Sequence, residues 1–174
     1  MKNLLIAVIS IFIISSASAA AADQNTIIYV GSGSQINDSK NLNKGTPGSI
    51  GFMHQLENSE VIFGLDFADE GTRLVSNTWV YNPEAMGFSL NVLIGSNLYD
   101  NSEWKIDGAV LVGFREISAT CPRSYLGFRC YANRREGTEH ETNYGGVVML
   151  SYNRLSFGVR ITEVSQQTLL GFRF

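Results

Sequence analysis

Apolar and polar residues alternate with a period of two along most of the chain after residue 25. Successive side chains of a β-strand point to opposite faces, so this pattern predicts strands with one apolar face. No stretch of useful length has the 3.6-residue period of an amphipathic helix. We therefore predict eight strands, at residues 26–34, 47–57, 60–69, 85–96, 102–115, 142–152, 154–164 and 166–174.

The gaps between these strands alternate between short and long. The short gaps are 58–59, 97–101 and 153, and the long ones are 35–46, 70–84 and 116–141. This alternation predicts an antiparallel meander in which every second connection lies at the same end. The last gap, at Val164 and Ser165, departs from the pattern because it is short. Residues 70–84 could extend two strands or form a hairpin of their own, which would make ten strands.

The two faces of the predicted strands differ in composition. Strand 60–69 places Val61, Phe63, Leu65 and Phe67 on one face and Glu60, Ile62, Gly64 and Asp66 on the other. Strands 85–96, 102–115, 154–164 and 166–174 show the same division, and the apolar face of these five strands carries no Asp, Glu, Lys or Arg.

Two kinds of closed barrel show such alternation. A soluble lipocalin-like binding barrel keeps its apolar face inside, whereas an outer-membrane barrel turns it toward lipid. The interior of an eight-stranded barrel is only just wide enough for side chains, so it would be overfilled by the Phe, Trp, Leu and Ile of these faces. We therefore predict an all-β fold: a closed, antiparallel, up-and-down transmembrane β-barrel of eight strands, with ten as the alternative. The soluble periplasmic barrel is the less favoured class.

The N-terminal residues predict export. Lys2 precedes an unbroken apolar stretch, Leu4 to Ile14, which is followed by the small residues Ala17-Ser18-Ala19. This is the layout of a secretory signal peptide, and the apolar stretch is too short to span a bilayer as a helix. We expect cleavage after Ala19, or alternatively after residue 22, so that residues 20–174 form the barrel domain.

Charge and cysteine content narrow the function classes further. Without Lys2 the chain has 12 basic and 16 acidic residues, a formal net charge of −4, and it has no basic run that would favour nucleic acid. No cofactor motif is present. Cys121 and Cys130 lie in a polar stretch of an exported chain, which favours a disulfide over a metal site, since His140 has no partner ligand.

The face opposite the apolar one contains six charged residues of both signs. They are the acids Glu60, Asp66 and Asp107 and the bases Lys105, Arg160 and Arg173. Unpaired charges are costly away from bulk water, so we expect these residues to pair within the lumen and to plug it. A conducting lumen is the less favoured alternative, because porins need about twice as many strands.

The C-terminal residues Leu169-Leu170-Gly171-Phe172-Arg173-Phe174 form a strand that ends in Phe at the chain terminus. This end resembles the C-terminal signature of bacterial outer-membrane proteins, and with its size and loop pattern the mature chain resembles the small eight-stranded OmpA-like and OmpX-like barrels. The resemblance implies that Phe172 and Phe174 are read by the barrel-assembly machinery, and that the protein lies in the outer membrane of a Gram-negative bacterium. We expect a monomer.

An enzymatic alternative depends on the segment His140-Glu141-Thr142-Asn143. It resembles the His-x-Ser-Asn stretch of PagL-like lipid A deacylases, but Thr142 stands where the nucleophilic Ser would be. Glu139 or Glu141 could orient the imidazole in a site of this kind. His54 shares the face of Phe52 and is expected to point toward lipid near the inner rim. We expect no catalytic or metal site.

The third long gap is the most distinctive candidate for a binding function. It carries the two cysteines together with basic and aromatic residues: Arg123, Tyr125, Phe128, Arg129, Arg134 and Arg135. Basic side chains at the cell surface would pair with the phosphates of lipopolysaccharide, or the loop would bind an envelope or host partner. The expected function is therefore envelope structure or surface binding and adhesion.

Overall fold

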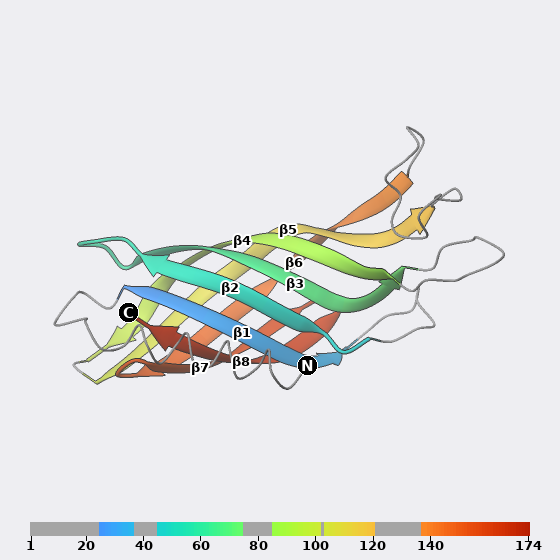
Figure 1. The fold of residues 1–174 in the computed structure, drawn as a ribbon. Helices are drawn as coiled ribbons and strands as arrows, with labels where there is room; N and C mark the ends of the chain where they lie inside the picture. The colour runs from blue at the N-terminus through green and yellow to red at the C-terminus, as the bar shows by residue number, and fades with distance from the viewer. Residues whose placement is uncertain (1–24, 37–44, 75–84, 102, 121–136) are drawn as a thin grey trace.

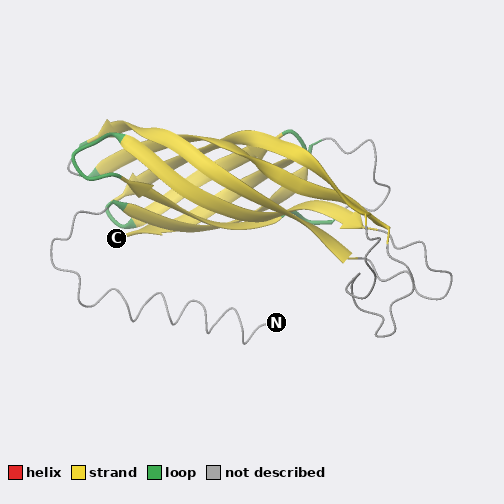
Figure 2. Cartoon of the chain, turned by 90° about the horizontal axis from the view of Figure 1, so that it is seen from above, coloured by secondary structure: helices red, strands yellow, loops and turns green. Residues whose placement is uncertain are grey.

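A computed structural model describes residues 25–36, 45–74, 85–101, 103–120 and 137–174. The described residues form eight strands and no helix (Figure 2). The strands are β1 (Thr26–Gln35), β2 (Gly48–Gln55), β3 (Val61–Leu74), β4 (Ala85–Asp100), β5 (Trp104–Thr120), β6 (Gly137–Tyr152), β7 (Leu155–Thr162) and β8 (Ser165–Arg173). The predicted signal peptide lies outside the described residues.

The strands form a closed barrel in chain order, and each strand is antiparallel to both of its neighbours (Figure 1). β1 closes the ring by pairing with β8, from Ile27↔Arg173 to Gln35↔Ser165. β3 pairs directly with β4, which leaves no place for two further strands in the wall. The eight-stranded prediction is confirmed, and the ten-stranded alternative is wrong.

One end of the barrel is closed by tight turns. Asn58 and Asn153 have positive φ values of 57° and 51° in these turns, a conformation that Asn tolerates better than most residues. The chain terminus lies at the same end, where the Thr26 N–H donates to the Phe174 carbonyl over 3.0 Å. We call this the turn end and the opposite end the loop end.

Several strands extend beyond their predicted bounds at the loop end, and for β3 this agrees with the alternative in which residues 70–84 extend the neighbouring strands. β3 runs to Leu74, and β5 and β6 add residues to Thr120 and from Gly137. β4 leaves β5 at Arg115 and β7 leaves β6 at Gly145. The β5–β6 hairpin therefore projects beyond the barrel wall (Figure 1).

The division of faces is confirmed along the strands. Leu90 is 43% exposed on the outer wall, whereas Leu93, three residues further along β4, is completely buried. The outer wall carries exposed apolar side chains from all eight strands, among them Val30, Phe52, Phe63, Leu90, Val112, Leu150, Phe157 and Leu170. The barrel is thus apolar outside, the opposite of a soluble barrel.

Glycines on the inner face allow close packing across the narrow interior. A Cβ at Gly64 would lie 2.2 Å from the Phe52 carbonyl oxygen and 3.1 Å from Leu93 Cδ1. At the outward-facing Gly146, a Cβ would lie 3.4 Å from its nearest atom, the Ala109 carbonyl oxygen. Only the inner position is closed to a larger residue.

This difference gives a matched test of the interior. Gly64→Phe should lower the free energy of unfolding by about 3 kcal/mol or abolish folding, because the interior cannot expand. Gly146→Phe adds the same side chain to the outer wall and should fold normally. Heat-modifiable migration on gels shows whether each variant folds. Normal folding of Gly64→Phe would contradict this packing of the interior.

Candidate functional site: a sealed, charge-paired interior

The guanidinium of Arg160 is the centre of the loop-end half of the interior. Its side chain projects inward from β7 and is fully buried. Nη2 lies 2.9 Å from Asp66 Oδ1 and 2.6 Å from Glu70 Oε1, and Nε donates to Asp66 over 3.1 Å. One cation thus bridges two carboxylates of β3, which sit on the same face four residues apart.

Neutral donors satisfy the remaining oxygen positions of both carboxylates. Glu70 accepts bonds from the side chains of Ser89, Asn143, Thr162 and Ser165. Asp66 accepts from Tyr29 Oη at 2.9 Å and Asn91 Nδ2 at 2.8 Å. These donors come from five different strands, β1, β4, β6, β7 and β8, so the cluster links the barrel wall across its interior. Two carboxylates can be accommodated beside one guanidinium because each of their four oxygens accepts a hydrogen bond.

A second, smaller cluster lies near the turn end. Arg173 of β8 forms an ion pair with Asp107 of β5, and its Nε donates to Ser151 Oγ over 3.2 Å. Asn97 Nδ2 donates to Asp107 Oδ1 over 2.8 Å. Arg173 and Asp107 are almost completely buried, so this cluster is also part of the interior.

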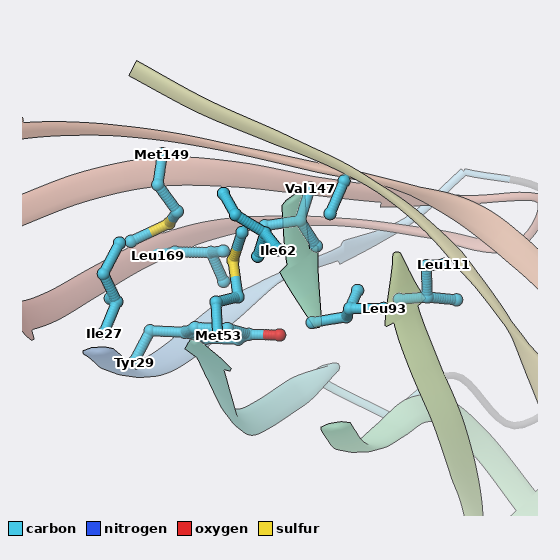
Figure 3. Packing of buried hydrophobic residues seen from close by; sticks show 10 residues of the cluster. Ile27, Tyr29, Met53, Ile62, Leu93, Leu111, Val147, Met149 and Leu169 are labelled. Atoms are coloured by element: carbon cyan, nitrogen blue, oxygen red, sulfur yellow. The ribbon is translucent and has the colours of Figure 1, made fainter. Parts of the chain in front are cut away.

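Bulky apolar side chains separate the two clusters. On β8, Leu169 lies between Arg173 and Ser165, and on β6, Val147 and Met149 lie between Asn143 and Ser151. The layer comprises Ile27, Tyr29, Met53, Ile62, Leu93, Ala109, Leu111, Val147, Met149 and Leu169 (Figure 3). A recess at the turn end, lined by Met53, Gln55 and Arg173 among others, has no room for a water molecule. Side chains therefore fill this recess and form a continuous apolar layer across the interior.

Two of the six predicted lumen residues lie elsewhere. Glu60 is exposed in the β2–β3 turn, because β3 begins at Val61. Lys105 lies at the turn-end rim, where its Nζ is 2.9 Å from Asp100 Oδ2 on the register-paired strand β4. The other four predicted residues, Asp66, Asp107, Arg160 and Arg173, form the two buried ion-pair clusters.

Sequence reasoning missed two charged residues of the interior. Glu70 lies in the long gap 70–84, for which strand extension and a separate hairpin were both open, and neither Glu70 nor Arg115 was singled out, yet both are buried. Arg115 Nη2 lies 2.7 Å from Glu141 Oε2 at the loop end. Glu70 continues the inward parity of Ile62, Gly64, Asp66 and Ala68, so extending the alternation beyond residue 69 would have found it.

The segment of the enzymatic alternative is divided between the two faces of β6. His140 and Thr142 are exposed on the outer wall, and the His140 ring meets the Phe114 ring edge-on at 5.7 Å. Glu141, on the other face of β6, pairs with Arg115. Glu116, the register partner of His140, accepts a hydrogen bond from the Phe88 N–H at 3.2 Å. These contacts give no support to a hydrolytic triad.

The other predicted sites are placed only in part. His54 faces outward near the turn end, with Nδ1 2.9 Å from Thr26 Oγ1. Several predicted features lie outside the described residues: the disulfide Cys121–Cys130 and the candidate binding residues Arg123, Tyr125, Phe128, Arg129, Arg134 and Arg135.

Within the described part of the chain, no cluster of His, Cys, Asp or Glu could hold a metal, and no helix is long and apolar enough to cross a membrane.

No family model matches this chain, and no curated protein does. Among solved structures, it is similar to the backbone structure of the Yersinia pestis outer membrane protein Ail in a phospholipid bilayer nanodisc. The two are 12% identical, with a TM-score of 0.43, and the match covers 87% of this chain and all of that one.

The bridging role of Arg160 generates a stability prediction. Arg160→Met leaves Asp66 and Glu70 buried without their cation and should lower the free energy of unfolding by about 3–5 kcal/mol. Lys105→Met removes an ion pair at the rim and should cost about 1 kcal/mol or less. Urea unfolding in lipid vesicles measures both, and equal effects of the two substitutions would contradict the central role of Arg160.

Proposed function

We propose that this protein is an integral, non-conducting barrel of the bacterial outer membrane that acts through surface binding at its loop end. The observation that supports this most strongly is the apolar outer wall around an interior of ion pairs and packed side chains. In hydrocarbon every backbone polar group needs an internal partner, and a closed barrel provides it. In water, the same wall would be a large exposed apolar surface.

The two ends of the barrel suggest its orientation. Barrels of the outer membrane have short periplasmic turns and longer extracellular connections, which would place the turn end in the periplasm. Trp104 and Tyr152 pack at the turn-end rim with ring centroids 4.7 Å apart. Such amphipathic rings suit the level of the lipid headgroups. The projecting β5–β6 hairpin then faces the outside of the cell.

Surface binding is the role that this hairpin suits best. β5 and β6 stay paired beyond the barrel wall as far as Thr120 and Gly137, and loops held on such scaffolds commonly carry function. Four arginines within residues 121–136 favour an anionic ligand such as the phosphates of lipopolysaccharide. A general role in envelope structure is the less specific alternative.

The pairing of β1 with β8 agrees with an assembly role for the C-terminal residues. The N–H and carbonyl of Phe174 both bond to Thr26, so the last residue of the chain completes the closing strand pair. We infer that Phe172 and Phe174 are the residues presented to the barrel-assembly machinery.

Membrane insertion is tested on β3. Phe63→Arg, near the middle of the apolar wall, should lower the free energy of unfolding in lipid vesicles by about 2–4 kcal/mol. Val61→Arg, near the turn-end rim, should cost about 1 kcal/mol or less, because the side chain reaches the headgroups. The wild-type chain should fractionate with the outer membrane. A soluble periplasmic species, or equal tolerance of both arginines, would contradict insertion.

Anion binding is tested on the loop itself. Replacing Arg123, Arg129, Arg134 and Arg135 together by Gln should weaken binding to lipopolysaccharide micelles about tenfold or more and reduce its salt dependence, since charge-assisted contacts to phosphate would be lost. Lys105→Gln, at the turn end, is the control that should bind normally. Unchanged binding by the fourfold variant would leave envelope structure as the better assignment.

A further inference from the structure

The height of the apolar wall is uneven around the barrel. On the β4–β5 side, outward positions remain apolar up to Leu90, Val112 and Phe114. On the β8–β1 side, the apolar positions within the strands end at Leu170 and Val30, and the next outward residues toward the loop end are polar and exposed: Ser32, Ser34, Gln166 and Thr168. The exposed Ile36 follows only beyond the end of β1. Gln166 Nε2 donates to Ser34 Oγ over 3.3 Å, so these side chains point to the same outer surface.

The register allows the two walls to be compared at equal height. The Cα partners around the barrel run from Thr26 through His54, Phe63, Ile94, Val110, Gly146, Ile161 and Gln166 back to Ser34. The path returns to β1 eight residues higher (34 minus 26) after eight strands, so each step rises by one residue level. Val112 on β5, four steps from β1, is therefore level with Ser32, and Phe114 is level with Ser34.

The lower boundary of the apolar wall does not share this slope. We counted the heights of the lowest outward apolar residues with the same rise of one residue level per strand. They lie within two residue levels of one another: Trp104, Tyr152, Leu155 and Phe174. A tilt of the whole barrel would slant both boundaries together. The unevenness thus belongs to the loop-end half alone.

The apolar wall is about 26 Å high from Trp104 to Phe114 but only about 10 Å from Phe174 to Leu170, for strands rising about 3.4 Å per residue at a tilt of about 40°. The first height matches the band of about 25 Å that a bilayer requires. At the second, an undisturbed bilayer would press acyl chains against hydroxyl and amide groups, which is unfavourable.

We propose that the outer leaflet is locally thinned along the β8–β1 wall, where lipid headgroups and their water descend to Ser32, Ser34, Gln166 and Thr168. This inference rests on the proposed membrane insertion. These four side chains are uncharged. Their hydroxyl and amide groups both donate and accept hydrogen bonds, so they suit the mixed polar groups of a lipid headgroup layer. Bilayers accommodate short apolar walls by thinning at modest cost.

Nitroxide labels at matched heights test the proposal. Ser32→Cys and Val112→Cys are made in a Cys121→Ser, Cys130→Ser background, and each is reconstituted in phosphatidylcholine vesicles. Collision with dissolved oxygen reports acyl chains, and collision with a nickel chelate reports water. We expect the nickel-to-oxygen ratio to exceed unity at Ser32 and to fall below unity at Val112. Val30→Cys, two residues below Ser32, is the control that should resemble Val112.

Each other outcome overturns a separate claim. An oxygen-dominated label at Ser32 would show acyl chains at normal height and end the thinning proposal, while insertion would stand. A Ser32 label shielded from both reagents would indicate a second copy on this wall, which also overturns the proposal. A nickel-dominated label at Val112 would contradict insertion itself.

A second measurement keeps the native cysteines in case their replacement prevents folding. Ser32→Trp and Val112→Trp are compared in vesicles of lipids brominated deep in the acyl chains. The emission added by the Val112→Trp residue should be quenched at least twice as strongly as that added by Ser32→Trp. Equal quenching would overturn the proposal.

Discussion

Closure of the sheet between β1 and β8 is the constraint on which the rest of the structure depends. Eight strands leave an interior only as wide as opposing side chains, so the bulky apolar residues of each strand cannot all point inward. The alternation of large and small side chains then determines which face of each strand points away from the lumen. Glycines such as Gly64 permit long inward side chains to cross the lumen, and Leu65 and Phe63 on either side of it form the outer wall.

The interior is sealed in layers. Arg160 with Asp66 and Glu70 occupies the loop-end half, Arg173 with Asp107 the turn-end half, and an apolar layer lies between them. Buried ion pairs contribute little net stability, but removing one partner is costly, so such clusters favour one arrangement of the strands over others. A barrel held in this way can carry a projecting hairpin and an uneven outer wall without losing its register.

The fold could be predicted from the sequence because a period of two, once repeated in eight segments, specifies strands, faces and turn positions together. The charged interior could be predicted only in part. Asp66, Asp107, Arg160 and Arg173 were found by parity, whereas Glu60 was misplaced because a residue at a strand end can belong to the turn. Glu70 was missed because polar residues next to a long gap are typical of a loop, although strand β3 continues through them to Leu74. Which charges pair depends on register across strands, which alternation alone does not specify.

The central claim is that this barrel is apolar outside and sealed inside, and leucine methyl groups report both faces in one spectrum. Cross-relaxation from lipid acyl-chain protons to the methyls of the folded protein in bilayer nanodiscs should reach the outward Leu65, Leu90, Leu150 and Leu170. It should be absent from the inward Leu93, Leu111 and Leu169. Transfer to the inward leucines, with none to the outward set, would contradict the account.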